Sequence, residues 1–417
     1  MKLIKRKGYL EKLIHTVETP DIKVITGIRR SGKSKLLEAF IDYVKKNYKN
    51  ANIIHINFNL MKFESIKTAQ ALNDYIENNY TENVENFVFI DEIQMCEGFE
   101  KVINSIHAEE KFHIYITGSN AFLLSSDLAT LFTGRTFEIK VFPFSFSEYL
   151  EYFKESDIQK AFDDYTRYGG MAGSYSYKTE NEKYDYIADV FKTLIVRDIQ
   201  QKYKIRNINL LSKVSDFLID NISTEVSTHS IANTLTSAKD KTNNKTVSAY
   251  LKYLCSSFAF YKIRRYDIRG KKYLASQDKY YLADHSFKYA LLGTKNLDYG
   301  RTYENIVAME LLRRGYELYA GVLYKKEIDF VAIKQHEKIY IQVSDDISND
   351  KTFEREITPL LSIKDAYPKI IIARTRHEEY SKEGVRILDI ALWLNEGNYL
   401  RLELRMPAPR AGVLPLH

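Results

Sequence analysis

The sequence predicts an α/β protein built on a mostly parallel sheet, followed by a largely helical region and a second α/β unit. Short apolar runs typical of buried strands alternate with segments whose apolar residues recur at helical spacing. The spacing G-x-x-x-x-G-K-S, from Gly27 to Ser34, lies between one such strand and one such helix. Farther along, several predicted helices lead into a basic β-hairpin and then into renewed strands.

The first 170 residues contain five predicted strands. A helix within residues 1–20 comes first, and a strand leads into Gly27. The other predicted strands cover 52–57, 87–90, 112–116 and 137–141, and the predicted helices cover 35–48, 68–80, 99–109 and 148–165. Three glycines between Tyr168 and Gly173 then mark a hinge or a domain boundary.

The glycine-rich loop predicts a phosphate site. Glycines let the loop curl so that its N–H groups converge on phosphate oxygens, and the positive end of the next helix points at the same anion. Lys33 can reach the β- and γ-phosphates, and Ser34 can ligate the Mg²⁺ that bridges them. We therefore expect ATP and Mg²⁺ as ligands. The residues expected around the phosphates are Gly27, Ile28, Arg29, Arg30, Ser31, Gly32, Lys33, Ser34 and Lys35.

A second motif, Asp91-Glu92, ends the apolar run 87–90. A buried strand of a parallel sheet delivers such acids to its carboxyl edge, where ligands of these sheets bind. Asp91 is expected to hold Mg²⁺, mostly through water, and Glu92 to orient and activate the attacking water. The alternative is a pair of acids in a surface turn. Because Asp91-Glu92 follows a phosphate loop, we favour a role in ATP hydrolysis over a surface turn.

The segments GIRRSGKS, FVFIDEIQ, ITGSN, TGR and FPFSFSEYL resemble the AAA-type ATPases of bacteria and archaea. More narrowly, they resemble the subfamily that carries a C-terminal restriction-endonuclease-like domain, and the resemblance spans nearly the whole chain. It implies that Ser119 or Asn120 senses the γ-phosphate and that Arg30 helps to order the loop. It also implies that Arg135 stabilises transition-state charge, in cis or from a neighbouring subunit of a homo-oligomer.

The middle of the chain has the order of elements of a winged helix. Predicted helices cover 182–201, 210–222, 228–235 and 243–257, and predicted strands cover 260–267, 271–275 and 280–283. Basic residues gather on the hairpin, and the last helix offers a polar face, so double-stranded DNA is a candidate partner. The alternative is a lid or a surface that binds an unidentified protein. The candidate DNA contacts are Lys245, Thr246, Ser248, Lys252, Lys262, Arg264, Arg265, Arg269, Lys271 and Lys272.

The C-terminal part resembles a nuclease domain of the PD-(D/E)xK type. Predicted helices cover 300–314 and 352–363, and predicted strands cover 317–319, 327–333, 338–343 and 370–373. That chemistry needs two acids that hold a divalent metal and a lysine that assists the nucleophile. Glu304 and Asp329 match, whereas Gln342 replaces an acid and Ser344 stands where the lysine belongs. The domain is therefore expected to be inactive, with an ATP-gated metal-dependent nuclease as the alternative.

Charge, cysteine count and hydropathy limit the classes of protein to which the chain can belong. The 417 residues carry a net charge of +6, only two cysteines, and no apolar run near the ~18 residues of a membrane span. We expect a cytoplasmic protein without a membrane partner. The expected division is an ATPase core at 1–170, a helical lid and winged helix at 171–295, a nuclease-like domain at 296–405 and a non-native or disordered tail at 406–417. The favoured function is a DNA-associated ATPase motor or switch, with a signalling or protein-binding ATPase as another alternative.

Overall fold

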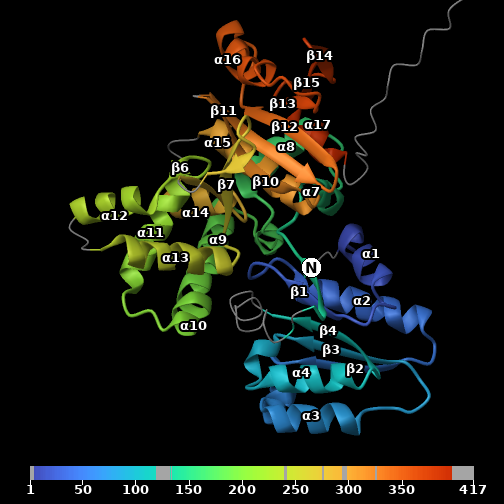
Figure 1. The fold of residues 1–417 in the computed structure, drawn as a ribbon. Helices are drawn as coiled ribbons and strands as arrows, with labels where there is room; N and C mark the ends of the chain where they lie inside the picture. Colours follow the sequence, from blue (N-terminus) through green and yellow to red (C-terminus); the bar gives the residue numbers. More distant parts are fainter. Residues whose placement is uncertain are drawn as a thin grey trace, which may run out of the picture.

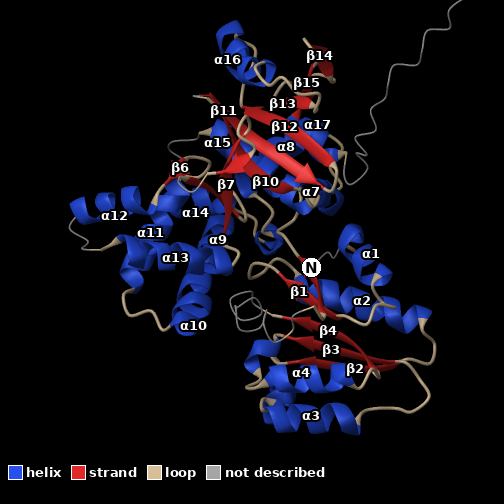
Figure 2. Ribbon diagram, in the orientation of Figure 1, coloured by secondary structure: helices blue, strands red, loops and turns tan. Residues whose placement is uncertain are grey.

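Two sheets organise the chain. The computed structural model describes residues 4–118, 132, 134–238, 242–274, 277–293, 298–324 and 326–396. A five-stranded sheet forms the N-terminal part, and a ten-stranded sheet forms the C-terminal part (Figure 1). A group of helices from the middle of the chain lies beside the larger sheet (Figure 2).

The N-terminal sheet is parallel throughout, with the strand order β2-β3-β4-β1-β5. The predicted parallel α/β core is thus confirmed. Strand β4 lies between β1 and β3, so the carboxyl ends of these three strands meet at one edge. The strands are β1 (Ile22–Thr26), β2 (Asn52–Asn57), β3 (Asn86–Asp91), β4 (Phe112–Thr117) and β5 (Thr136–Lys140).

Helices cover both faces of this sheet because alternate side chains of its buried strands point in opposite directions. On β3, Phe87 and Phe89 pack in the cluster that contains α1 and α2, whereas Val88 and Ile90 pack in the cluster that contains α3 and α4. The helices are α1 (Lys7–His15), α2 (Lys33–Asn47), α3 (Ala69–Asn78) and α4 (Phe99–Ala108), with short 3₁₀ turns η1 (Met61–Ile66) and η2 (Ile93–Met95).

The helix predicted over 148–165 is two helices, and the single-helix prediction was wrong. Helix α7 (Phe146–Phe153) starts with a capping box of Ser145 and Glu148 and ends where Lys154 takes a left-handed conformation with φ 55°. Helix α8 (Ile158–Tyr168) restarts with the side chain of Asp157 as its N-cap. A 3₁₀ turn, η3 (Ala172–Ser176), follows.

The middle helices share one hydrophobic core. The predicted apolar face of the helix at 243–257 is buried there, since Val247, Leu251 and Leu254 are at most 5% exposed. The stretch predicted to be helical over 182–201 is helical, with α9 turning into a π-helical segment after Thr193. The elements are α9 (Glu180–Thr193), η4 (Leu194–Gln200), α10 (Gln201–Tyr203), α11 (Ile208–Asp220), α12 (Thr228–Ser237), α13 (Asn244–Ser256) and α14 (Ser286–Leu292).

The larger sheet is mixed, with the path β14-β15-β13-β12-β11-β10-β7-β9-β6 and β8 paired to β7. Because β7 pairs with both β9 and β10, this sheet runs across the domain boundary predicted near residue 295. The strands are β6 (Glu225–Val226), β7 (Phe260–Asp267), β8 (Lys272–Tyr273), β9 (Asp278–Leu282), β10 (Glu317–Leu323), β11 (Lys326–Lys334), β12 (Glu337–Ser344), β13 (Lys369–Ala373), β14 (Tyr380–Lys382) and β15 (Val385–Asp389).

Three helices accompany this sheet: α15 (Tyr299–Arg313), α16 (Asp350–Leu361) and α17 (Ile390–Asn395). Helix α15 contacts β9, β10, β11 and β12 and so spans the middle of the sheet. Pro359 lies inside α16, which continues to Leu361. The patterns did not predict β6, α14 or the elements after residue 373, and the tail expected at 406–417 lies outside the described residues.

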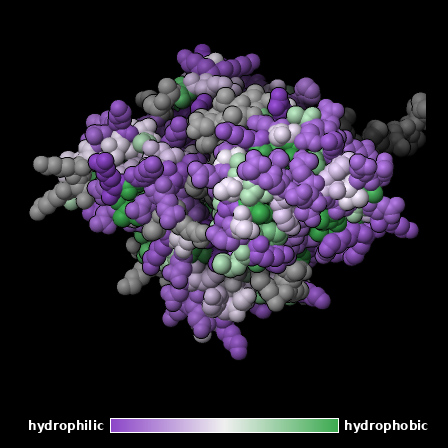
Figure 3. All heavy atoms as spheres, turned by 90° about the horizontal axis from the view of Figure 1, so that it is seen from below, coloured by the Kyte–Doolittle hydropathy of each residue, from purple (hydrophilic) through white to green (hydrophobic). Residues whose placement is uncertain are grey.

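The surface seen from below in Figure 3 is mainly hydrophilic, with apolar residues in small scattered groups. Among the described residues, no helix combines the length and the apolar character that crossing a membrane requires. Both cysteines, Cys96 and Cys255, are free thiols.

Candidate nucleotide site

The phosphate loop connects β1 to α2 and depends on two of its glycines. Gly27 has φ 142°, and a Cβ at this position would lie 2.1 Å from the carbonyl oxygen of Val141. Gly32, with φ 96°, is the N-cap of α2, so the helix starts at Lys33. Side chains are strained at both positions, and the loop conformation therefore requires glycine there.

Lys33 lies beneath the loop that precedes it. Its side chain is buried, and its ammonium group donates to the carbonyl oxygens of Gly27 and Ile28 at 2.9 and 3.1 Å. Burial lowers the pKa of Lys33, whereas the nearby carboxylates of Glu92 and Asp91 act in the opposite direction. A buried cation is thus held within the curl of the loop.

Asp91, at the carboxyl end of β3, is bonded to both neighbouring elements. Ser34 Oγ donates to Asp91 Oδ1 at 3.1 Å, and Thr117 Oγ1 at the end of β4 donates to the same oxygen. Burial raises the pKa of Asp91, and these two hydrogen bonds oppose that rise. The structure therefore brings together Ser34 and Asp91, the two residues predicted to hold Mg²⁺.

Sequence reasoning missed Thr117, although it lies in the segment ITGSN. Its hydroxyl also accepts the backbone N–H of Glu92 at 3.2 Å. The signal that could have identified it is its position at the end of a strand that a parallel sheet places beside Asp91. One threonine thus fixes the two predicted acids relative to each other.

Glu92 takes a left-handed conformation, with φ 58°, immediately after the strand. The side-chain amide of Gln94 donates to its carboxylate, and Glu92 also lines the pocket described next. A non-glycine residue in this conformation is uncommon and turns the side chain away from the direction of the strand. The carboxylate is thereby presented to the pocket.

A pocket of about 650 Å³ extends from the phosphate loop. Lys33, Ser34 and Glu92 line it, together with tyrosines such as Tyr152 and Tyr186. Within the loop, Ser31 Oγ is buried and has no hydrogen-bond partner in the described part of the chain. Loop amides, a lysine, a hydroxyl and two acids are the donor set that a triphosphate with Mg²⁺ requires, so the residues fit that ligand.

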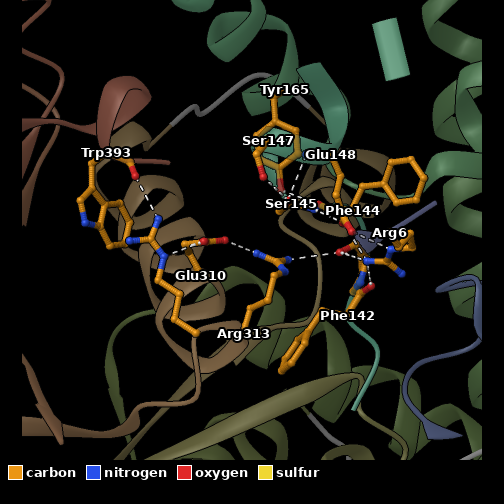
Figure 4. A network of polar contacts seen from close by, with 12 residues as sticks. Arg6, Phe142, Phe144, Ser145, Ser147, Glu148, Tyr165, Glu310, Arg313 and Trp393 are labelled. Atoms are coloured by element: carbon orange, nitrogen blue, oxygen red, sulfur yellow. Dashed lines mark hydrogen bonds and ion pairs between the residues drawn. The ribbon is translucent and has the colours of Figure 1, made fainter. Parts of the chain in front are cut away.

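Arg6 ties this loop to the rest of the protein, and sequence reasoning missed it. Its guanidinium donates to the carbonyl of Ser31 at 2.8 Å. It also donates to the carbonyl of Phe142 at 2.9 Å and to the carboxylate of Glu148 (Figure 4). From the other side, Arg313 of α15 donates to the carbonyl of Pro143 at 3.2 Å. The turn after β5 thus contacts both the phosphate loop and the C-terminal part of the chain.

Three other predicted loop residues, Arg29, Arg30 and Lys35, also line the pocket of about 650 Å³. Arg29 forms an ion pair of 3.4 Å with Asp198 of η4, a partner from the middle helices that the sequence did not indicate. Arg30 is exposed, with φ 65°. Lys35 is exposed and pairs with Glu38 one turn farther along α2.

Arg135 lies far from the phosphate loop of its own chain. Its carbonyl accepts the N–H of Ile22 at 2.8 Å, so it lies at the amino end of β1, whereas the loop follows the carboxyl end. The five residues of β1, at about 3.3 Å each, separate the two ends by about 16 Å. The predicted sensors Ser119 and Asn120 lie outside the described residues.

The predicted DNA contacts divide into exposed and paired residues. Arg265 is paired with Glu225 at 3.0 Å, and Lys262 with Asp278 at 2.6 Å. Thr246 bonds Asn243 at the start of α13. The exposed residues, for which the described part of the chain shows no ion pair, are Lys245, Lys252, Arg264, Arg269, Lys271 and Lys272.

The structure brings the predicted nuclease-like residues together. The N–H of Val343 donates to Asp329 Oδ2 at 2.8 Å, and the side-chain oxygen of Gln342 accepts the N–H of Asp329 at 3.3 Å. Lys279 forms ion pairs with both Glu304 and Asp329 and so links the two acids. Sequence reasoning did not identify Lys279. Ser344 bonds the carbonyl of Asp346. In the described ranges, no three His, Cys, Asp or Glu residues are arranged to hold a metal ion.

Comparison with known proteins places the phosphate loop and Asp91 in a recognised domain. Residues 19–150 match a family described as AAA domain, and residues 159–298 match a domain of unknown function (DUF8612). An uncharacterized protein of Haemophilus influenzae is 39% identical over 399 residues, which cover 94% of this chain and 98% of that protein. An uncharacterized protein of Methanocaldococcus jannaschii is 28% identical over 86% of this chain and 82% of its own length.

Solved structures are more distant. The Aeropyrum pernix Orc1 protein in complex with DNA has a TM-score of 0.32 and 11% identity, over 75% of this chain and 94% of that one. A likeness of this size carries no conclusion about the present chain.

Proposed function

The chain belongs to the same family as the uncharacterized Haemophilus influenzae protein, and we propose that its activity is Mg²⁺-dependent hydrolysis of ATP. The observation that carries this proposal is the convergence of Lys33, Ser34 and Asp91 beside Glu92, within the part of the chain that matches an AAA domain. Loop amides and the Lys33 ammonium would bind the phosphates, and Ser34 with Asp91 would hold the metal.

Each protein group has a distinct role in this mechanism. Bound Mg²⁺ would neutralise charge on the β- and γ-phosphates. Glu92 accepts a proton from the attacking water while the Gln94 amide holds its carboxylate and the Thr117 hydroxyl holds its backbone N–H. Arg135 is too distant to act in cis, and this supports action from a neighbouring subunit of a homo-oligomer. Size-exclusion chromatography with and without ATP tests that assembly.

Removal of the metal should stop the reaction. We expect the purified chain to release phosphate from ATP in the presence of Mg²⁺ and to lose nearly all of this release when EDTA is added, because Ser34 and Asp91 lack the positive charge needed at the phosphates. The measurement is steady-state phosphate release. Release that is unchanged in EDTA would contradict the metal assignment.

We further propose that the ATPase acts as a DNA-associated motor or switch. Its support is the element order α11, β6, α12, α13, β7, β9, with the antiparallel pairs β6–β9 and β7–β9, which fits a winged helix. Lys271 and Lys272 are exposed at the tip of the β7–β8 hairpin, where a wing reaches phosphates. The alternative, a protein-binding ATPase, is supported by the other edge of β7, which pairs with β10 and so holds the hairpin within the larger sheet.

A paired substitution tests the DNA proposal. The variant K271Q/K272Q should bind duplex DNA more weakly, and the slope of log affinity against log salt should fall by about 2 for two lost phosphate contacts. Fluorescence anisotropy of a labelled duplex at several salt concentrations measures both quantities. The control is K45Q/K46Q, which changes two adjacent exposed lysines on α2. An equal effect of both variants, or no binding by the unmodified chain, favours the protein-binding alternative.

A further inference from the structure

The acidic cluster of the nuclease-like part is built around a lysine. The ammonium of Lys279, on β9, lies 2.9 Å from Glu304 Oε1 and 3.8 Å from Asp329 Oδ1, and it also pairs with Glu327. Tyr281, two residues farther along β9, donates its hydroxyl to the same Glu304 oxygen at 2.7 Å. The three acids come from α15 and β11. One ammonium thus contacts acids from two elements.

Lys279 is one of the most buried charges in the described part of the chain, with 3% of its surface exposed. Glu304 and Asp329 are each 8% exposed. Burial alone would lower the pKa of Lys279, but Glu304, Asp329 and Glu327 raise it above the ordinary lysine value. Burial raises the pKa of both Glu304 and Asp329, and Lys279 opposes the rise in each case. The lysine therefore remains charged and serves as the counter-ion of the cluster.

A divalent metal of the kind that PD-(D/E)xK nucleases use does not fit these residues. It would need the oxygens of Glu304 and Asp329 as ligands, and the Lys279 ammonium lies against both. An ammonium group offers three donors and no lone pair, so it competes with a metal for the same oxygens. Gln342, the remaining candidate ligand, already accepts the N–H of Asp329.

We infer that Lys279 takes the place of a metal ion in this cluster, which joins β9 to α15 and β11 as an internal ion-pair lock rather than forming a nuclease centre. The lock connects strands on either side of the boundary predicted near residue 295. Lys279 and Tyr281 contribute from β9, while Asn305 of α15 bonds both the N–H and the carbonyl of Leu282 at 2.7 and 3.0 Å. This role does not depend on ATP hydrolysis.

Thermal unfolding of the nucleotide-free chain tests the lock. K279M should lower Tm by at least about 5 °C, because it leaves buried carboxylates without their counter-ion. The matched control is K288M, since Lys288 is also buried on a neighbouring element, where the described residues give it no ion pair. The double variant K279M/E304Q should lose less than the sum of the two single variants. Additive effects, or an unchanged Tm for K279M, would overturn the inference.

Metal binding gives an independent readout that does not require K279M to fold. Mn²⁺ is titrated calorimetrically into the nucleotide-free wild type and into D329N. We expect the two proteins to bind Mn²⁺ equally, because no metal ion binds at Asp329. Binding that D329N abolishes would mean that the cluster is a metal site and would overturn the inference, even if K279M proves too unstable to purify. Because ATP is absent throughout, a failed ATPase assay leaves both results interpretable.

Discussion

Replacing Lys33 with alanine will weaken ATP binding by at least about 100-fold, which corresponds to about 3 kcal/mol. The Lys33 ammonium is buried within the loop and is held there by the carbonyls of Gly27 and Ile28. Its loss removes a buried cation from within the curl, and backbone amides alone cannot balance the charge of the β- and γ-phosphates. Titration with a fluorescent ATP analogue measures the change.

The control for Lys33 lies in the last turn of the same helix. Lys46 is exposed and does not line the pocket of about 650 Å³, so K46A changes the net charge equally without touching the phosphate loop. We expect K46A to bind ATP within about threefold of the wild type, because solvent screens an exposed charge outside the site. Equal losses for K33A and K46A would mean that net charge, rather than the Lys33 position, determines binding.

Replacing Glu92 with glutamine will lower turnover by about 10²- to 10⁴-fold and leave ATP binding nearly unchanged. Glutamine keeps the size of the side chain but cannot accept a proton from water at neutral pH. The backbone conformation at this position and the bond from its N–H to Thr117 should persist, because neither involves the carboxylate. Phosphate release and nucleotide titration on the same sample separate turnover from binding.

Glu97 supplies the matched control for Glu92. It lies five residues farther along the same segment, is exposed, and does not line the pocket of about 650 Å³. E97Q should therefore hydrolyse ATP at the wild-type rate. Turnover by E92Q at the wild-type rate would show that Glu92 is not the general base.

The local sequence pattern was enough to predict much of the N-terminal fold. The apolar run 87–90 could only be buried on both faces, and it became a central strand of a parallel sheet. The loop from Gly27 to Ser34 was predictable from its motif spacing, because the two glycines and the start of α2 lie within a few residues of one another. The adjacency of Ser34 and Asp91 was predictable although 57 positions separate them, because a parallel sheet brings the carboxyl ends of its strands to one edge.

Contacts between distant parts of the sequence were not predictable in this way. Arg6 reaches Glu148 across 142 positions, and Lys279 reaches Glu304 from a strand assigned to another domain. Spacing along the chain carries no signal for such pairs. The break at Lys154 was missed for a different reason: the surrounding residues favour helix on both sides, and only the N-cap at Asp157 marked the restart.

The steady-state rate of phosphate release from MgATP, measured together for the wild type, K33A and E92Q, tests most directly whether the phosphate loop and the Asp91-Glu92 pair form one hydrolytic site. We expect continuous release by the wild type and almost none by either variant, with ATP still bound by E92Q. Wild-type protein that binds ATP without releasing phosphate, or E92Q that releases it at the wild-type rate, would mean that these residues do not form one hydrolytic site.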